Sequence, residues 1–311
     1  MSNTSARDHR GMTLTNFIQL LVTGMAMGAI YALTAKGLFI AHLTTNRVNF
    51  GQGDFLMAAS FVSLAAIGAG LPLPLAVLAV VTVLSLMGWG LERFAVRPLD
   101  RFGAGRAGGA LAWILTTAGM ALILQNTVEL LWGKSSQYSP PLFSDRRDNV
   151  ITVGQIGFFL EELLIILAAF AAVGAFWWAL FRTRWGRDVY TVAFNPDAAS
   201  LLGIDVRRTV TSVWIIAALL AAVSGILVGP LVTVHPHMGL IFTIKALAVA
   251  SLGGFANPIG ILVGGILFGV AEALANYWDS KYGDLYPLLF VMAMLVLKPS
   301  GIFGESKADI R

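Results

Sequence analysis

Charged side chains inside long apolar runs are the residues of this sequence that are best placed for chemistry. Four of them interrupt otherwise apolar stretches: Lys36, Asp54, Lys245 and Glu272. An ionised group at mid-membrane costs roughly 2.5–3.5 kcal/mol on insertion scales, so such residues face protein or water and often mark a solute path. An ion pair between one of the lysines and Glu272 would instead explain those charges without a transport role.

No arrangement of nucleophile, base or metal ligands accompanies these charges. Cysteine is absent, and the four histidines lack the spacing of a helical zinc site. Gly133-Lys-Ser135 resembles the end of a phosphate-binding loop, but Val128 stands where that motif needs glycine. The string Gly103-Ala-Gly-Arg-Ala-Gly108 follows no predicted strand, so it does not indicate a dinucleotide site. We therefore expect no enzyme activity, metal or cofactor on this chain.

The composition is that of a membrane protein. The chain has 311 residues, of which 57% are apolar and 12% charged, and its mean hydropathy is +0.77. Soluble domains carry about a quarter charged residues. The arginines sit beside apolar runs and form no single basic face, so the net charge of +4 does not indicate nucleic-acid binding. These values predict an all-α, polytopic transmembrane helical bundle in contact with the lipid bilayer.

A bilayer requires about 20 apolar residues per helix, and this length predicts eight or nine spans, some of them short or broken. The segment 241–252 is a half-helix or a short tilted span, and it either crosses or re-enters. Residues 14–298 form one transmembrane domain between a polar N-terminal segment, 1–13, and a tail, 299–311. The predicted spans are 14–41, 55–70, 75–91, 110–132, 160–181, 210–234, 241–252, 259–275 and 285–297.

Arginine-rich loops at residues 92–109 and 182–209 place these segments in the cytoplasm, because cytoplasmic loops carry an excess of positive charge. Counting spans from these loops puts the N-terminus outside, whereas Arg7 and Arg10 favour the opposite orientation. Residues 134–157 are then an external loop, in which we expect short extended pieces.

A polar, glycine-rich segment at residues 42–54 separates the first two spans. It contains Asn49 and Gln52, and Asp54 is expected to cap the following helix. Irregular backbone at membrane depth is either shielded by protein or lines a wet cavity. The alternative to such a break is an ordinary polar loop. A second polar break, His235–Gly239, precedes another apolar segment in the other half of the chain. If this symmetry is not a coincidence, it predicts two repeats around a central path.

The second cytoplasmic loop contains the signals of a short, capped helix. Asn195 can cap it, Pro196 suits the first helical position and Gly203 suits its end. A helix of about two turns is not stable alone in water, so it must dock against something. Its small apolar face consists of Ala198, Ala199, Leu201 and Leu202.

Six segments together resemble the branched-chain amino-acid permease family of bacterial ABC importers, whose relatives carry urea, short amides and other small organic solutes. The resemblance extends from about Leu14 to Gly304. The segments are Tyr31 to Gly37, Val48 to Met57, Glu92 to Leu99, Asn195 to Ile204, Lys245 with Gly253 and Gly254, and Asn257 to Glu272.

This resemblance implies a multi-pass subunit of the bacterial inner membrane that pairs with a second, similar permease, two cytoplasmic ATPases and a periplasmic solute-binding protein. ATP and magnesium would be bound by the ATPases. The coupling helix would dock on an ATPase through Arg187, Asn195, Pro196, Ala198, Ala199, Leu202 and Gly203. The translocation path would involve Lys36, Asn49, Gln52, Asp54, Lys245 and Glu272.

Two departures from the family pattern lie near this path. Lys36 stands where the family has an apolar residue, and Phe50-Gly51 differs from the more usual Phe-Ala. The leading hypothesis is a subunit of an ATP-driven importer of branched-chain amino acids or a related solute. The alternative is a self-sufficient secondary transporter or channel for a small neutral solute.

Overall fold

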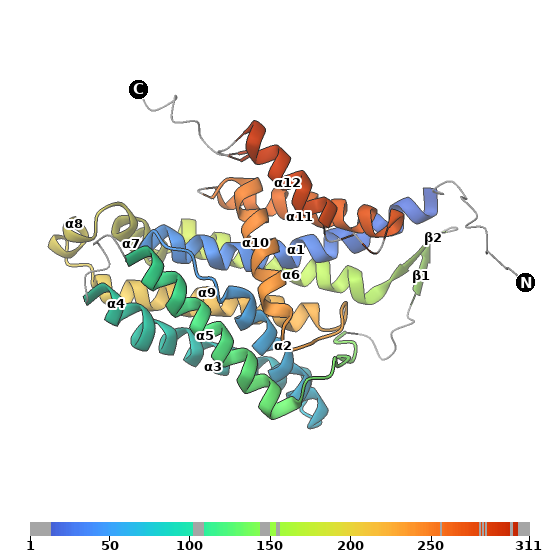
Figure 1. Ribbon diagram of the computed structural model, residues 1–311, viewed down its shortest axis with the longest axis horizontal. Helices are drawn as coiled ribbons and strands as arrows, with labels where there is room; N and C mark the ends of the chain where they lie inside the picture. Colours follow the sequence, from blue (N-terminus) through green and yellow to red (C-terminus); the bar gives the residue numbers. More distant parts are fainter. Residues whose placement is uncertain are drawn as a thin grey trace, which may run out of the picture.

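The computed structural model is an elongated bundle of helices (Figure 1). The arginine-rich segment of the second predicted loop lies at one end of its long axis, and a β-hairpin lies at the other. The structure describes residues 14–101, 109–143, 150–153, 156–255, 257–279, 281, 283, 285–298 and 301–303. The predicted segment 1–13, most of the tail and the loop residues 102–108 therefore lie outside the described residues.

Six helices in this part of the chain are long and apolar enough to cross a membrane. They agree with six of the predicted spans: α1 (Leu14–Thr45), α3 (Leu73–Leu91), α5 (Gly109–Trp132), α6 (Leu160–Arg182), α9 (Val206–Val228) and α11 (Pro258–Trp278). Three shorter apolar helices occupy the remaining predicted spans: α2 (Gln52–Gly68), α10 (Met238–Gly253) and α12 (Leu285–Leu297). The helical bundle is confirmed, while the number of crossings stays a prediction.

Helix α1 forms the centre of the bundle and packs against α9 and α11. Glycines allow its backbone to approach that of α11. A Cβ atom added at Gly28 would lie 2.5 Å from the carbonyl oxygen of Gly265, and one at Gly24 would lie 2.7 Å from Cα of Val270. The small residues of these two helices therefore form packing surfaces, as is usual for membrane helices.

Residues 92–101 of the first predicted cytoplasmic loop are helical, and their side of the membrane stays a prediction. A π-helical turn, Glu92–Val96, follows α3 and leads into α4 (Arg97–Arg101). The guanidinium of Arg97 donates to both carboxylate oxygens of Glu92, with a shortest distance of 2.8 Å. This bidentate pair neutralises two charges that sequence reasoning assigned to a loop.

Extended structure occurs at the opposite end of the bundle. Strands β1 (Val150–Val153) and β2 (Ile156–Phe159) form an antiparallel hairpin with Val150 opposite Phe159. Gln137 and Val234 form an isolated bridge, with N–O distances of 2.8 and 2.9 Å, which joins the segments after α5 and α9. The expected short extended pieces of the external loop are confirmed.

Candidate functional site

The capped segment in the second arginine-rich loop forms two short helices, α7 (Arg184–Phe194) and α8 (Pro196–Leu201). The Asn195 side chain accepts a hydrogen bond of 3.0 Å from the backbone N–H of Ala198. Gly203 ends the segment with φ of +82°, a backbone conformation that side-chain-bearing residues rarely adopt. The predicted cap, first-turn proline and terminal glycine of α8 are confirmed.

Helix α8 does not present the single apolar face that its sequence suggests. Ala199 is fully buried, whereas Leu201 and Leu202 are 88% and 74% exposed. The neighbouring Phe194 is also exposed. A helix of under two turns offers only a few positions to each side, so its inner side is filled by Ala199 and the leucines point outward. Ala199 thus holds the helix in place, and the leucines are available to a partner.

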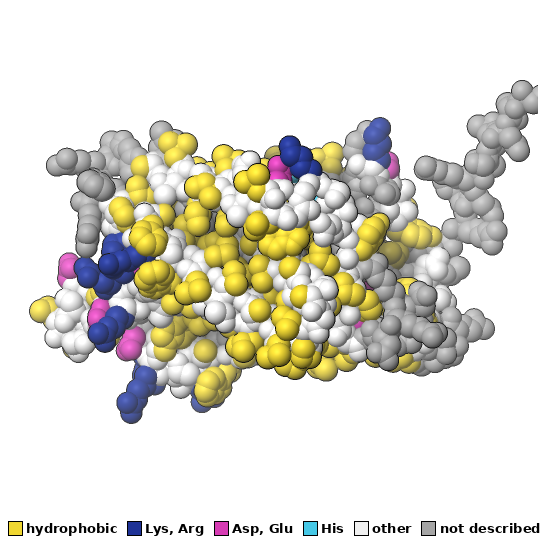
Figure 2. Space-filling model, turned by 90° about the horizontal axis from the view of Figure 1, so that it is seen from below, with side chains coloured by type: hydrophobic (Ala, Val, Ile, Leu, Met, Phe, Trp, Pro, Cys, Tyr) yellow, Lys and Arg dark blue, Asp and Glu magenta, His cyan; other side chains and the backbone are white. Residues whose placement is uncertain are grey.

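Basic residues surround α8. Arg187 on α7 is exposed, as are Arg182, Arg184, Arg207 and Arg208. Figure 2 shows Lys and Arg side chains gathered at the end of the molecule where Figure 1 places α4, α7 and α8, while apolar side chains cover the flank. This distribution is the one expected for a cytoplasmic end beside a lipid-facing belt.

The C-terminal part of the polar break between α1 and α2 is buried in protein. Asn49, Gln52 and Asp54 are at most 1% exposed. The Asn49 side chain accepts from the N–H of Gly51 and donates to Oε1 of Gln52, whose amide donates to the carbonyl oxygen of Ala217 on α9 at 2.9 Å. Of the two predicted environments, shielding by protein is the one observed, and every polar group named here has a partner.

Helices α2 and α10 begin beside each other. The backbone N–H of Gly53 donates to Oγ1 of Thr243 at 2.9 Å. A Cβ atom at Gly53 would clash with the carbonyl oxygen of Gly239, and one at Gly239 would clash with the Asp54 carboxylate. The two polar breaks of the sequence therefore lead into short helices whose first turns touch.

The expectation that Asp54 caps α2 is wrong. The helix begins two residues earlier, at Gln52, so Asp54 lies inside the first turn. Its Oδ1 accepts a hydrogen bond of 2.8 Å from the Gln125 amide on α5. The side-chain oxygen of Gln125, Oε1, lies 3.4 Å from Nδ1 of His237, whose Nε2 lies 2.7 Å from Oε1 of Glu129. Gln125 was not predicted as a site residue, because nothing in its local sequence indicates a partner on α2.

Lys245 and Glu272 form the intramembrane ion pair that the sequence left as one possibility. Nζ of Lys245 lies 2.9 Å from Oε1 of Glu272. The hydroxyl of Tyr31 donates to the same carboxylate oxygen at 3.1 Å and accepts from Lys245 at 3.3 Å. The triad joins α1, α10 and α11 through Oε1 of Glu272.

Lys36 does not join this triad. Its ammonium donates to the carbonyl oxygen of Pro258 at the start of α11 and lies 5.9 Å from the ring centroid of Phe176 on α6. The side chain is 1% exposed, so it faces protein as expected. The six predicted path residues thus divide into three groups: the polar break beside α10, the triad, and Lys36 alone.

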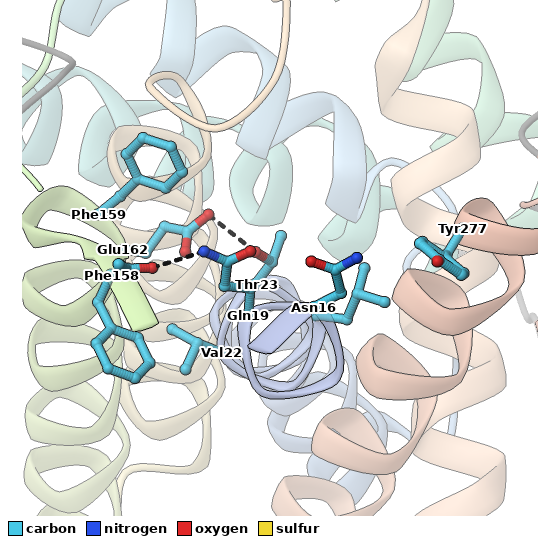
Figure 3. Close-up of a pocket in the computed structure, with 10 residues that line it drawn as sticks. Asn16, Gln19, Val22, Thr23, Phe158, Phe159, Glu162 and Tyr277 are labelled. Carbon is cyan, nitrogen blue, oxygen red and sulfur yellow. Dashed lines mark hydrogen bonds between the residues drawn. The ribbon is translucent and has the colours of Figure 1, made fainter. Parts of the chain in front are cut away.

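A cavity opens beside the N-terminal half of α1, at the end of the bundle opposite α8. Two neighbouring pockets form it, one of about 400 Å³ and one of about 270 Å³, and we call them its larger and smaller lobes. Leu20, Thr23, Glu162 and Tyr277 line both lobes. Figure 3 shows Glu162, from α6, on one side of α1 and Tyr277, from α11, on the other. No local motif in the sequence indicated this cavity, since its walls come from distant segments.

Together, the lipid-facing helices, the charged end and the buried polar groups define a multi-pass helical membrane protein. The chain belongs to the family described as branched-chain amino acid transport system / permease component, whose model matches residues 20–298. The predicted family is therefore confirmed. As permeases, its members are components of membrane transport.

The chain is similar in sequence to permeases of known name, three of which follow with their identity and coverage. It is 29% identical to the high-affinity branched-chain amino acid transport system permease protein LivH of Escherichia coli K12, over 94% of this chain and 97% of LivH. It is 30% identical to the corresponding protein BraD of Pseudomonas aeruginosa, over 94% and 98%. It is also 25% identical to the galactose/methyl galactoside import permease protein MglC of Haemophilus influenzae, over 88% and 81%.

Proposed function

We propose that this chain is the transmembrane subunit of an ATP-driven importer that moves branched-chain amino acids or a related small organic solute across the bacterial inner membrane. ATP and magnesium are bound by separate cytoplasmic ATPases. A second homologous permease and a periplasmic solute-binding protein complete the assembly. Relatives named as branched-chain amino acid permeases, similar over almost their whole length, support the substrate class.

The observation that carries the proposal is the exposed apolar surface of α8. Leu201 and Leu202 project from a capped helix that is buried on its other side only through Ala199. Exposed leucines at a basic, water-facing end have no lipid to contact, so a protein groove is the environment that covers them. A short capped helix seated in such a groove transmits a movement of the ATPase to α7 and α9, which flank it in the chain.

The buried polar groups suit a path that opens only during transport. Asn49, Gln52 and Asp54 are closed off by the contact between α2 and α10. A relative movement of these two helices would expose amide and carboxylate groups that now bond to protein. The protein-facing environment of Lys36 makes it a support for α1 against α11, and the proposed path does not require its charge.

Uptake by reconstituted vesicles tests this function. Vesicles that contain the complete assembly, with ATP on the ATPase side and binding protein on the other, should accumulate labelled leucine. The same vesicles without ATP, and vesicles that contain only this chain, should not. Accumulation by the chain alone would contradict the proposal and favour the alternative of a self-sufficient transporter.

A further inference from the structure

The charged side chains among the described lining residues of the cavity beside α1 are all acidic. Its described lining residues include two carboxylates, Glu162 and Glu272, and no lysine, arginine or histidine. Glu272 is neutralised by Lys245 behind it, at 2.9 Å. The carboxylate of Glu162 accepts a hydrogen bond of 3.0 Å from the Thr23 hydroxyl, its only hydrogen-bond partner among the described residues. The described lining of the cavity therefore supplies no cation to Glu162.

Glu162 is partly removed from water, because it lies half-buried in the first turn of α6 between α1 and the hairpin. A half-buried carboxylate whose only described partner is a hydroxyl is stabilised by a cation that enters the cavity. An ammonium group in the cavity has three N–H donors. One or two of them can donate to the Glu162 carboxylate, which leaves at least one for another oxygen of the lining. The Thr23 hydroxyl already fixes the position of the carboxylate, so the group is oriented before a ligand arrives.

Much of the remaining cavity lining consists of aliphatic side chains. The larger lobe is lined by Leu20, Met27, Leu231, Val232 and Ala273. With its neighbour, this lobe falls within the size range of small-molecule sites, about 300–1,000 Å³. Amide and phenol groups at the rim, from Asn276 and Tyr277, supply further hydrogen-bonding groups.

We propose that this cavity, at the end opposite α8, binds small aliphatic molecules that carry an ammonium group, with the Glu162 carboxylate as the counter-ion and the larger lobe as the seat of the alkyl chain. This inference rests on the proposed function only for the role of the cavity, which would be to receive an amino acid at the outer side of the membrane before transport. Binding itself requires neither the ATPase nor a binding protein.

Three probes that share one carbon skeleton test the recognition. L-Leucine carries ammonium and carboxylate, 3-methylbutylamine carries only ammonium, and 4-methylpentanoate carries only carboxylate. Calorimetric titration of the purified full chain in lipid nanodiscs should show binding of leucine and of the amine, and no binding of the acid. Binding of the acid as tightly as the amine, or no binding of the amine to the natural chain, would overturn the proposal.

Variants then locate the site. Glu162→Gln should weaken amine binding at least tenfold, and Glu129→Gln, at a carboxylate outside the cavity lining, should leave it unchanged. Should Glu162→Gln fail to fold, Ala273→Trp provides the second test, because it fills the larger lobe and should abolish binding while Glu162 stays in place. Unchanged amine binding in a folded variant of either kind would assign the ammonium to another site.

The outcome is separable from that of the proposed function. ATP-driven leucine uptake by the natural assembly together with failure of the amine to bind the chain would leave the importer standing and exclude this cavity as its outer site. Amine binding that depends on Glu162, in an assembly that does not transport leucine with ATP, would support the cavity and contradict the transport function.

Discussion

Nζ of Lys245 and Oε1 of Glu272 lie 2.9 Å apart, between α10 and α11, and both side chains are almost fully buried. Buried ions of this kind are stable only as a pair, because either one alone keeps its desolvation cost and loses its counter-charge. The pair therefore fixes α10 against α11 beside the outer cavity. Loss of either charge should therefore destabilise the folded protein.

Lys245→Met should lower the unfolding free energy by about 3 kcal/mol, because it leaves the Glu272 carboxylate buried without its cation. The double variant Lys245→Met with Glu272→Gln should recover much of this loss, since no charge remains. Thermal unfolding of the three purified proteins in one detergent measures the difference. A double variant that is less stable than the single one would show that the two charges do not act as a pair.

Gly28 allows α1 to touch α11, so Gly28→Ala should destabilise the protein and reduce the amount that inserts and folds. The added carbon would lie 2.5 Å from the carbonyl oxygen of Gly265. Gly174 on α6 is the matched control, because an added Cβ there meets nothing within 4 Å. Gly174→Ala should leave the melting temperature unchanged or raised, since alanine favours helix by about 1 kcal/mol over glycine. Equal effects of the two changes would contradict the tight contact.

The two ends of the bundle should lie on opposite sides of the membrane. The chain contains no cysteine, so each introduced thiol gives an unambiguous signal. Leu202→Cys should react with a membrane-impermeant maleimide only from the cytoplasmic side, and Tyr138→Cys only from the outer side. Both positions are exposed, at 74% and 69%. Labelling of both thiols from one side of sealed cells or inverted vesicles would contradict this orientation.

His235, in the turn between α9 and α10, should stay neutral near pH 7. Burial lowers its pKa, and the neighbouring His237 lowers it further. Since the unfolded chain binds this proton at a pH near 6.5, acidification below that value should favour unfolding through His235. Imidazole NMR signals of the labelled protein, assigned with His235→Gln, should give a midpoint below 6.5. A midpoint above 6.5 would reverse the predicted sign.

Local signals in the sequence were sufficient for the helices and for α8. Asn195, Pro196 and Gly203 act on their own backbone, so their roles follow from type and order alone. The long apolar runs fixed the helices for the same reason, since lipid thickness sets their length. Asp54 was misplaced because a shift of two residues at a helix start changes a cap into a first-turn residue.

Contacts between distant segments were beyond sequence reasoning. Glu162 meets Thr23 across 139 positions of the chain, and Gln125 meets Asp54 across 71. Neither pair has a spacing or motif that could reveal it, because the pairs form only after α1, α2, α5 and α6 have packed. The pair of Lys245 and Glu272 was one of the predicted possibilities, because charges inside apolar runs are rare and usually pair with one another.

The Leu202→Asp variant tests whether this permease is coupled to an ATPase through α8. Leu202 is exposed and caps the end of α8, so the change should leave the fold intact and place a charge in the apolar contact. We predict at least a tenfold loss of ATP-driven leucine uptake and of ATPase subunits that copurify with the chain. Leu202→Met should retain both. Full uptake and copurification in Leu202→Asp would contradict the account.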